Sequence, residues 1–292
     1  MKPLDILRNT FLISRILGLA PVIITSHQCK KLGGFKIYNY CLLLINFILT
    51  IICFATLIPV PGVSKLVFAI QLHDIIISFT ISTYGVLIVL QKENYIHKAI
   101  NQLQNYANKH FLFNTKKVYF TSCFMLFFGV FSFIVNSFSV SFLALNVQDF
   151  NIGILISISA VLIFRAFTII PLQFYSLVLV VGGCWNSVNM RLFHEKKTVL
   201  FQKRKIIRKK IEKFKLVTED LLSILEEVNE TYARIIFLFC LALGGEWIYL
   251  IISYLQKDKI FFPINLKMIS LSIYLLICVA VCDFTRKQVS KN

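Results

Sequence analysis

The chain has 292 residues, of which 57% are hydrophobic and only 15% are charged, and its formal net charge is +17. Soluble domains average about 45–50% apolar and about 25% charged residues, so this composition excludes an ordinary soluble globular domain. A very apolar chain whose few charges are mostly basic is typical of a polytopic membrane protein.

The N-terminal segment, residues 1–36, contains a short apolar stretch, FLISRILGLAPVIIT (11–25), that carries Arg15 and is interrupted by Pro21. The stretch is short for a bilayer crossing, which takes about 20 residues. A cleaved signal peptide is disfavoured because Asp5 and Arg15 flank a poor apolar core. The sequence therefore predicts an interfacial or re-entrant helix that leads into the first membrane span.

Six later stretches are long and apolar enough to cross a bilayer as helices. They lie at 37–58, 66–90, 118–146, 152–185, 234–256 and 268–282. The predicted fold is all-α, a polytopic membrane helical bundle with six transmembrane helices. Its predicted parts are spans one to four at 37–185, a cytoplasmic loop at 186–233, spans five and six at 234–282, and a cytoplasmic tail at 283–292.

The distribution of Lys and Arg predicts the orientation. In the six-span arrangement, 26 of them lie on the side of the two termini and 4 lie in the loops on the opposite side. Because basic residues concentrate in cytoplasmic loops, both termini are expected in the cytoplasm.

The long loop at 186–233 divides by charge. Residues 201–215 hold eight Lys and Arg against one Glu, whereas five acidic residues follow at 219–230. The run at 152–185 is longer than a bilayer requires, so the flanking spans are expected to continue as long cytoplasmic helices. Apolar residues at helical spacing predict the inward face of the second helix: Leu216, Leu222, Leu225, Val228 and Tyr232.

Two roles stay open for this charged loop. A basic half followed by an acidic half suits folding back on itself or onto a neighbouring subunit. The alternative is a solvated run that faces lipid headgroups. Nucleic-acid binding is disfavoured because the membrane spans on either side explain the basic charge as an orientation signal.

Ionisable residues inside the predicted spans are the strongest site signals, because each is costly in hydrocarbon and usually faces the bundle interior. They are His73, Asp74, Arg165 and Glu246. Arg165 is predicted to pair with Asp74 or Glu246 in a structural polar clasp, and the alternative is that these residues contact a ligand. Phosphate-binding, hydrolase and metal-binding motifs are not found, so the sequence predicts no enzyme, no cofactor and no metal.

Three stretches carry a resemblance to a known family. The N-terminal segment ends in a Gly18-Leu19-Ala20-Pro21 step, the end of the fourth span reads FYSLVLVVGGCWNSVNMRL (174–192), and the approach to the fifth reads LLSILEEVNETYARIIFLF (221–239). With the layout of spans, these stretches resemble the insect gustatory receptor family, which is related to the insect odorant receptors. The resemblance implies a chemosensory receptor subunit of the cell membrane.

The resemblance also implies a mechanism. Members of that family bind small tastants in an outward-facing pocket and gate a cation channel built as a tetramer, here homomeric or heteromeric. A seventh span lines the pore in the family, whereas this chain ends at CDFTRKQVSKN after the sixth, so a truncated product is expected. The other partners implied are the lipid bilayer and the tastant, and nucleic acid is not among them.

The pocket implied by the resemblance lies among the outer halves of spans two to six. Aromatic walls with a few polar groups suit a small ligand. The predicted ligand-binding residues are His73, Asp74, Asn136, Phe142, Arg165, Trp247, Tyr249, Tyr254 and Tyr274. Two other classes stay open: a G-protein-coupled-like receptor, which would have its N-terminus outside, and a small-solute transporter, which would show internal repeats.

Overall fold

The structure is a computed structural model, and it describes residues 3–25, 29–56, 65–109, 115–147, 150–199, 204–255 and 262–290. These residues form eight helices and one pair of short strands. The elements are α1 (Pro3–Ile16), β1 (Val22–Ile24), β2 (Cys29–Lys31), α2 (Phe35–Thr56), α3 (Lys65–Gln91), α4 (Glu93–Lys109), α5 (Thr115–Val147), α6 (Phe150–Val199), α7 (Arg204–Leu255) and α8 (Phe262–Val289). The predicted class, an all-α membrane bundle, is confirmed.

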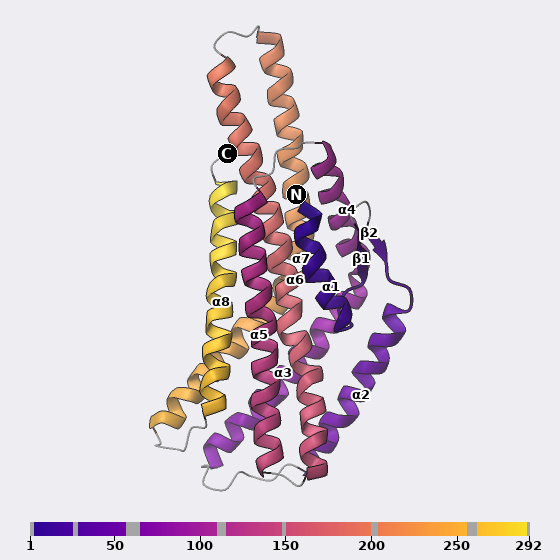
Figure 1. The fold of residues 1–292 in the computed structure, drawn as a ribbon, viewed down its shortest axis with the longest axis vertical. Helices are drawn as coiled ribbons and strands as arrows, with labels where there is room; N and C mark the ends of the chain where they lie inside the picture. The colour runs from indigo at the N-terminus through magenta and orange to yellow at the C-terminus, as the bar shows by residue number, and fades with distance from the viewer. Residues whose placement is uncertain are drawn as a thin grey trace.

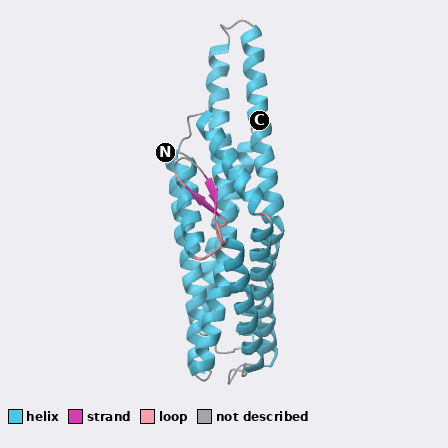
Figure 2. Cartoon of the chain, turned by 90° about the vertical axis from the view of Figure 1, so that its right-hand side faces the viewer, coloured by secondary structure: helices cyan, strands magenta, loops and turns pink. Residues whose placement is uncertain are grey.

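The long helices run side by side along the length of the molecule, with α6 inside the bundle (Figure 1). Helix α6 contacts α1, α2, α3, α5, α7 and α8, so most of the fold packs around it. Helices α6 and α7 have 50 and 52 residues and project beyond the other helices at one end (Figure 2). At 1.5 Å per residue each is about 75 Å long, which is more than twice a hydrocarbon core of about 30 Å.

Five helices are long and apolar enough to cross a membrane: Phe35–Ile52, Val118–Phe142, Phe150–Met190, Phe214–Gly245 and Ile269–Val289. Helix α3 contributes a shorter apolar helix, Ile76–Gln91, among the described residues. The predicted count of six spans therefore stays a prediction. Large apolar side chains lie exposed on α5, including Phe120 at 74% and Phe127 at 62%, as expected for a helix that contacts lipid.

The N-terminal segment differs from the predicted helix over 11–25, because α1 ends at Ile16. The Leu19 amide bonds to the Ser14 carbonyl at 2.7 Å and the Gly18 amide bonds to the Arg15 carbonyl at 2.9 Å, with Gly18 at a φ of 70°. This is a Schellman motif, in which a glycine in the left-handed region stops a helix. The chain then forms the antiparallel pair β1–β2, in which Val22 lies opposite Lys31.

Gly18 is required for a second reason. A Cβ atom added there would lie 2.2 Å from Cε1 of Tyr38, the exposed tyrosine near the start of α2. The turn after α1 therefore packs directly on α2. Helices α1 and α4 and the β1–β2 pair lie together along one side of the bundle (Figure 1).

The inward face of the N-terminal half of α7 was predicted partly wrongly. Val228 and Tyr232 are buried as predicted, but Leu216 and Leu222 are 63% and 38% exposed. The buried stripe consists of Val217, Leu221, Ile224, Val228 and Tyr232. Because successive helical residues point about 100° apart, choosing the leucine beside the true position rotates the side chain out of the core.

Candidate functional site

Helix α8 is joined to three other helices by hydrogen bonds within one short stretch. The Ser132 hydroxyl of α5 donates to the Ser270 carbonyl at 3.1 Å, and the Trp247 indole of α7 donates to the Ser272 hydroxyl at 3.1 Å. The Tyr274 hydroxyl donates to a carbonyl of α6 at 3.0 Å. These six residues are called the α8 seam: Ser132, Thr168, Trp247, Ser270, Ser272 and Tyr274.

The α8 seam lies in the half of the bundle away from the projecting ends of α6 and α7. Ser270 and Tyr274 are 8 and 12 residues from the start of α8, and Trp247 is 8 residues from the end of α7. These separations correspond to about 12 to 18 Å along the helices. The seam members on α7 and α8 therefore lie well inside a hydrocarbon core, whereas Thr168, 18 residues from the start of α6, lies about 27 Å along that helix and close to the opposite boundary.

Asn136 of α5 bonds to Ser132 of the α8 seam and has a buried amide oxygen without a hydrogen-bond partner among the described residues. Its side chain is fully buried, and its amide nitrogen donates to the Ser132 carbonyl at 2.5 Å. Its amide oxygen is buried without a hydrogen-bond partner among the described residues. A buried acceptor without a partner costs about 1–3 kcal/mol, so this oxygen is suited to a hydroxyl or amine donor from a ligand.

An aromatic cluster packs beside the α8 seam. The Tyr274 ring meets Phe239 edge to face, with ring centroids 6.2 Å apart and planes at 75°. Phe239 in turn lies 4.8 Å from Phe167 of α6. All three rings are buried, so α6, α7 and α8 share one aromatic core at this level.

The N-terminal segment is attached to α6, and through Gln173 of α6 to α7, by a second set of polar contacts. Arg165 donates to the Leu17 carbonyl at 2.8 Å, and the Gln173 amide donates to the Leu19 carbonyl at 3.0 Å. The Tyr232 hydroxyl donates to the Gln173 amide oxygen at 3.1 Å, and the Thr10 and Ser176 hydroxyls are 3.1 Å apart. These residues are called the N-terminal seam: Thr10, Leu17, Leu19, Arg165, Gln173, Ser176 and Tyr232.

The Schellman turn explains why side chains of α6 reach this segment. The last carbonyls of a helix have no partner within the helix, and the carbonyls of the turn that follows also need donors. Arg165, Gln173 and Ser176 are spaced by 8 and 3 residues, which places them on one side of α6. Sequence reasoning missed Gln173, Ser176 and Thr10, although a glutamine inside an apolar span is a signal of a buried polar contact.

The sequence profile of the family described as 7tm Chemosensory receptor matches residues 7–291. The chain belongs to the 7tm chemosensory receptor family. The match begins inside α1 and ends beyond α8, so both seams of this receptor lie within it, and the predicted resemblance to the insect gustatory and odorant receptors is confirmed. No curated protein matches the receptor significantly.

The predicted polar clasp of the receptor is described only at Arg165. Arg165 is buried, and its guanidinium bonds to the Leu17 carbonyl and lies beside the Tyr38 hydroxyl. Its Nε atom is buried and has no hydrogen-bond partner in the described part of the chain. The side chains of Asp74 and Glu246 lie outside the described residues, so a pairing with either carboxylate stays a prediction.

The other predicted ligand residues of this chemosensory receptor fall into three groups. Asn136, Trp247 and Tyr274 come together at the α8 seam, where Asn136 is joined through Ser132. Phe142 and Tyr254 are 42% and 76% exposed on α5 and α7. The side chains of His73 and Tyr249 lie outside the described residues, whereas Arg165 belongs to the N-terminal seam and not to the α8 seam.

Helix α4 links β2 of the receptor to α7. Lys98 pairs with Glu227, and the hydrogen bond to this carboxylate, followed by its charge, raises the pKa of Lys98. Cys29 of β2 is buried, which raises the pKa of its thiol to about 12, and its carbonyl lies 3.1 Å from Nε2 of His97. The thiol is therefore protonated at physiological pH and unreactive.

Proposed function

We propose that this chemosensory receptor is a gustatory-type subunit that binds a small tastant at the α8 seam and gates a cation channel. The observation that carries the proposal is the family match over residues 7–291. The buried, unpartnered amide oxygen of Asn136 supports the location of the ligand. The subunit acts in the cell membrane with a cytoplasmic N-terminus, in a homo- or hetero-tetramer with related subunits.

The chemistry of the α8 seam fits a small ligand with a hydrogen-bond donor. The donor bonds to the Asn136 amide oxygen, and an apolar part of the ligand packs on Trp247 and Tyr274. Phe142, Tyr249 and Tyr254 supply further aromatic surface, and His73 and Asp74 of α3 supply polar contacts. A ligand that binds better to the open state shifts the closed–open equilibrium by its difference in affinity for the two states.

Helix α6 is the proposed route from the ligand to the cytoplasmic helices. Its Thr168 carbonyl accepts the hydrogen bond from the Tyr274 hydroxyl of α8. Five residues further along α6, the Gln173 amide donates to the Leu19 carbonyl of the N-terminal segment. A displacement of α8 is therefore expected to move α6 against the N-terminal seam. A polar clasp of Asp74, Arg165 and Glu246 is proposed to fix the position of α6 in the resting state.

Current recording from cells tests the proposed function. The receptor is expressed alone and with related subunits, and currents are recorded for sucrose, caffeine and bicarbonate. For a tastant that activates, Asn136→Leu is expected to raise the half-maximal concentration about tenfold, because about 1.4 kcal/mol of binding is lost. Phe138→Leu on the same helix, where Phe138 is 57% exposed, serves as the control and should leave it unchanged.

Three outcomes would count against the proposal. A tastant response that Asn136→Leu leaves intact at equal surface expression would remove the α8 seam from the ligand site. An N-terminal epitope that antibodies reach in unpermeabilised cells would contradict the orientation and favour a G-protein-coupled-like receptor. Uptake of a labelled solute without current would favour a transporter.

A further inference from the structure

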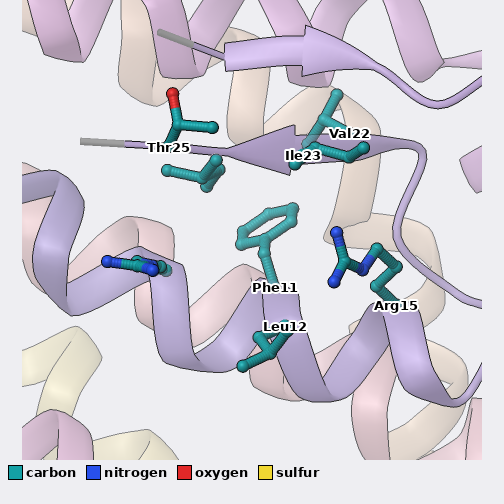
Figure 3. A pocket seen from close by; sticks show the side chains of 8 residues that line it. Phe11, Leu12, Arg15, Val22, Ile23 and Thr25 are labelled. Carbon is teal, nitrogen blue, oxygen red and sulfur yellow. The ribbon is translucent and has the colours of Figure 1, made fainter. Parts of the chain in front are cut away.

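A pocket of about 300 Å³ lies between α1 and β1, outside both seams. Figure 3 shows Arg15 and the Phe11 ring of α1 directed towards Val22 and Ile23 of β1 across this space. Phe11 and Val22 are buried and form the floor, whereas Leu12 is 43% exposed at the rim. The pocket is therefore concave, apolar at its base and open to the surroundings of the receptor.

Two arginines make the lining of this pocket basic. Arg8 and Arg15 are seven residues apart, which is two helical turns, and both line the pocket. Both are exposed, and neither has an ion-pair partner in the described part of the chain. Asp5, the acid of α1, is not among the lining residues. Guanidinium groups bind phosphate oxygens in a planar, two-point geometry, so the lining favours a phosphate group above an apolar floor.

The N-terminal seam places the pocket at a membrane surface. It holds α1 and its turn against residues 165–176 of α6, which are 15 to 26 residues from Phe150. These separations correspond to about 22 to 39 Å, and a hydrocarbon core of about 30 Å ends within that interval. The boundary between hydrocarbon and headgroups therefore passes along α1.

Exposed tyrosines at the same level support this position. Tyr38 and Tyr40 near the start of α2 are 50% and 52% exposed, and Tyr38 packs on the turn after α1. Tyrosine and tryptophan concentrate at the headgroup level of membrane proteins, where one end of the ring is apolar and the other is wet. Two independent features thus locate the pocket at the headgroups of one leaflet.

We propose that this pocket binds the headgroup of an acidic membrane phospholipid. The lipid phosphate lies between Arg8 and Arg15, and the start of an acyl chain lies against Leu12 and Ile23. With the N-terminus cytoplasmic, as proposed above, this is the leaflet that carries most anionic lipid. Because the N-terminal seam ties the same segment to α6 and α7, the bound lipid stabilises the N-terminal segment in its docked position.

Lipid binding to the purified receptor tests the proposal. Phosphatidylglycerol or phosphatidylcholine is added to the full chain in detergent, and bound lipid is counted by native mass spectrometry while thermal unfolding is followed in parallel. Arg8→Gln and Arg15→Gln are each expected to weaken phosphatidylglycerol binding about fivefold, because one basic residue near an anionic surface contributes about 1 kcal/mol. The double variant should lose about 25-fold, with little change for phosphatidylcholine.

The control removes a charge at the same depth outside the pocket. Arg234 is exposed on α7, 21 residues from Leu255, which is about 32 Å from that end. Arg234→Gln should leave phosphatidylglycerol binding unchanged, and equal losses for all three variants would overturn the proposal in favour of nonspecific charge attraction. If the double glutamine variant does not fold, Arg8→Lys with Arg15→Lys is used, which keeps the charge and is expected to retain part of the binding.

A competition experiment distinguishes a membrane lipid from a soluble phosphate compound as the ligand of this pocket. Glycerol 3-phosphate carries the same phosphate without acyl chains and is expected to compete only weakly with phosphatidylglycerol. Competition at equal concentration would assign the pocket to a soluble phosphate compound and overturn the lipid proposal. Loss of lipid binding with normal tastant-evoked current would leave the proposed receptor function intact, so the two proposals fail separately.

Discussion

The two seams are built from the same kind of bond but differ in the buried polar atom that has no partner among the described residues, which is a donor, Nε of Arg165, in the N-terminal seam and an acceptor, the amide oxygen of Asn136, next to the α8 seam. In the N-terminal seam, Thr10, Gln173 and Tyr232 are all completely buried, and the Gln173 amide both donates and accepts. In the α8 seam, Trp247 is 42% exposed, and the oxygen of Asn136, which is joined to the seam through Ser132, has no partner among the described residues. An unpartnered acceptor can bind a hydroxyl or amine of a ligand, whereas an unpartnered guanidinium N–H needs an acceptor such as a carboxylate or carbonyl.

The difference also concerns what the hydrogen bonds hold together. The α8 seam joins α8 to α5 and α6, with which α8 already packs extensively, so those bonds add little to the contact. The N-terminal seam joins α6 to a turn whose carbonyls have no helical partner, and Tyr232 of α7 supports the Gln173 side chain that makes one of these bonds. Loss of a donor should therefore lower the free energy of unfolding more in the N-terminal seam than in the α8 seam.

Gln173→Leu is expected to have the largest effect. It leaves the Leu19 carbonyl and the Tyr232 hydroxyl buried without partners, at about 1–3 kcal/mol each. Hydrogen exchange of residues 3–25 should become faster and thermal unfolding should begin at lower temperature. Gln288→Leu, at a buried glutamine of α8 whose amide oxygen has no described partner, should leave residues 3–25 protected. Unchanged exchange in Gln173→Leu would show that the N-terminal seam is not what holds the segment.

Gly18→Ala is expected to have the second-largest effect on thermal unfolding, and Gly34→Ala provides its matched control. Both glycines have a positive φ, 70° and 73°, so a side chain costs about 1–2 kcal/mol at either position. Only at Gly18 would the added carbon meet another residue, because nothing lies within 4 Å at Gly34. Gly18→Ala should therefore destabilise the receptor more than Gly34→Ala does, because the Tyr38 ring must also move. Equal shifts in thermal unfolding for the two variants would contradict the packing of the turn on α2.

Removing one hydroxyl from each seam compares them most directly. Tyr232→Phe leaves the Gln173 oxygen without its donor, at about 1–3 kcal/mol. Tyr274→Phe removes a donor to the Thr168 carbonyl, which also lies within the continuous helix α6, so about 0.5–1.5 kcal/mol is expected. Exchange should rise in residues 3–25 for the first variant and in α8 for the second. A larger loss for Tyr274→Phe would reverse the proposed order of the two seams.

The helices of the bundle were predictable because a bilayer allows few alternatives. A chain in hydrocarbon must satisfy every backbone group internally, so an apolar run of sufficient length is helical. The run predicted at 152–185 lies within α6, and the run at 118–146 matches α5 almost to the residue. The end of α1 was also visible in principle, since Gly18 followed by Pro21 is a helix-stop pattern. The three-residue strands after it are too short to show alternation.

Partners across the fold were less predictable. The sequence predicts that Arg165 pairs with a charged residue, but its described partner is the carbonyl of Leu17, 148 residues away in the chain. A turn carbonyl carries no signal in the sequence, although it accepts a charged hydrogen bond as well as many side chains do. The prediction of the buried face of α7 was partly wrong for a related reason. Leu216 and Leu222 are as apolar as the buried Val217 and Leu221, so composition alone does not show which side of the helix faces the core.

The exposed pair Lys98–Glu227 is expected to contribute least to the attachment of the N-terminal region, and its pH dependence identifies it. The hydrogen bond to Glu227 raises the pKa of Lys98 above its ordinary value of 10.5. A raised folded-state pKa means that the stabilisation is complete below 10.5 and is lost as pH rises through the raised value. The effect of Lys98→Met on thermal unfolding should therefore be constant from pH 6 to pH 9 and disappear in strong alkali. A change within the range from pH 6 to pH 9 would contradict the assignment of the effect to Lys98.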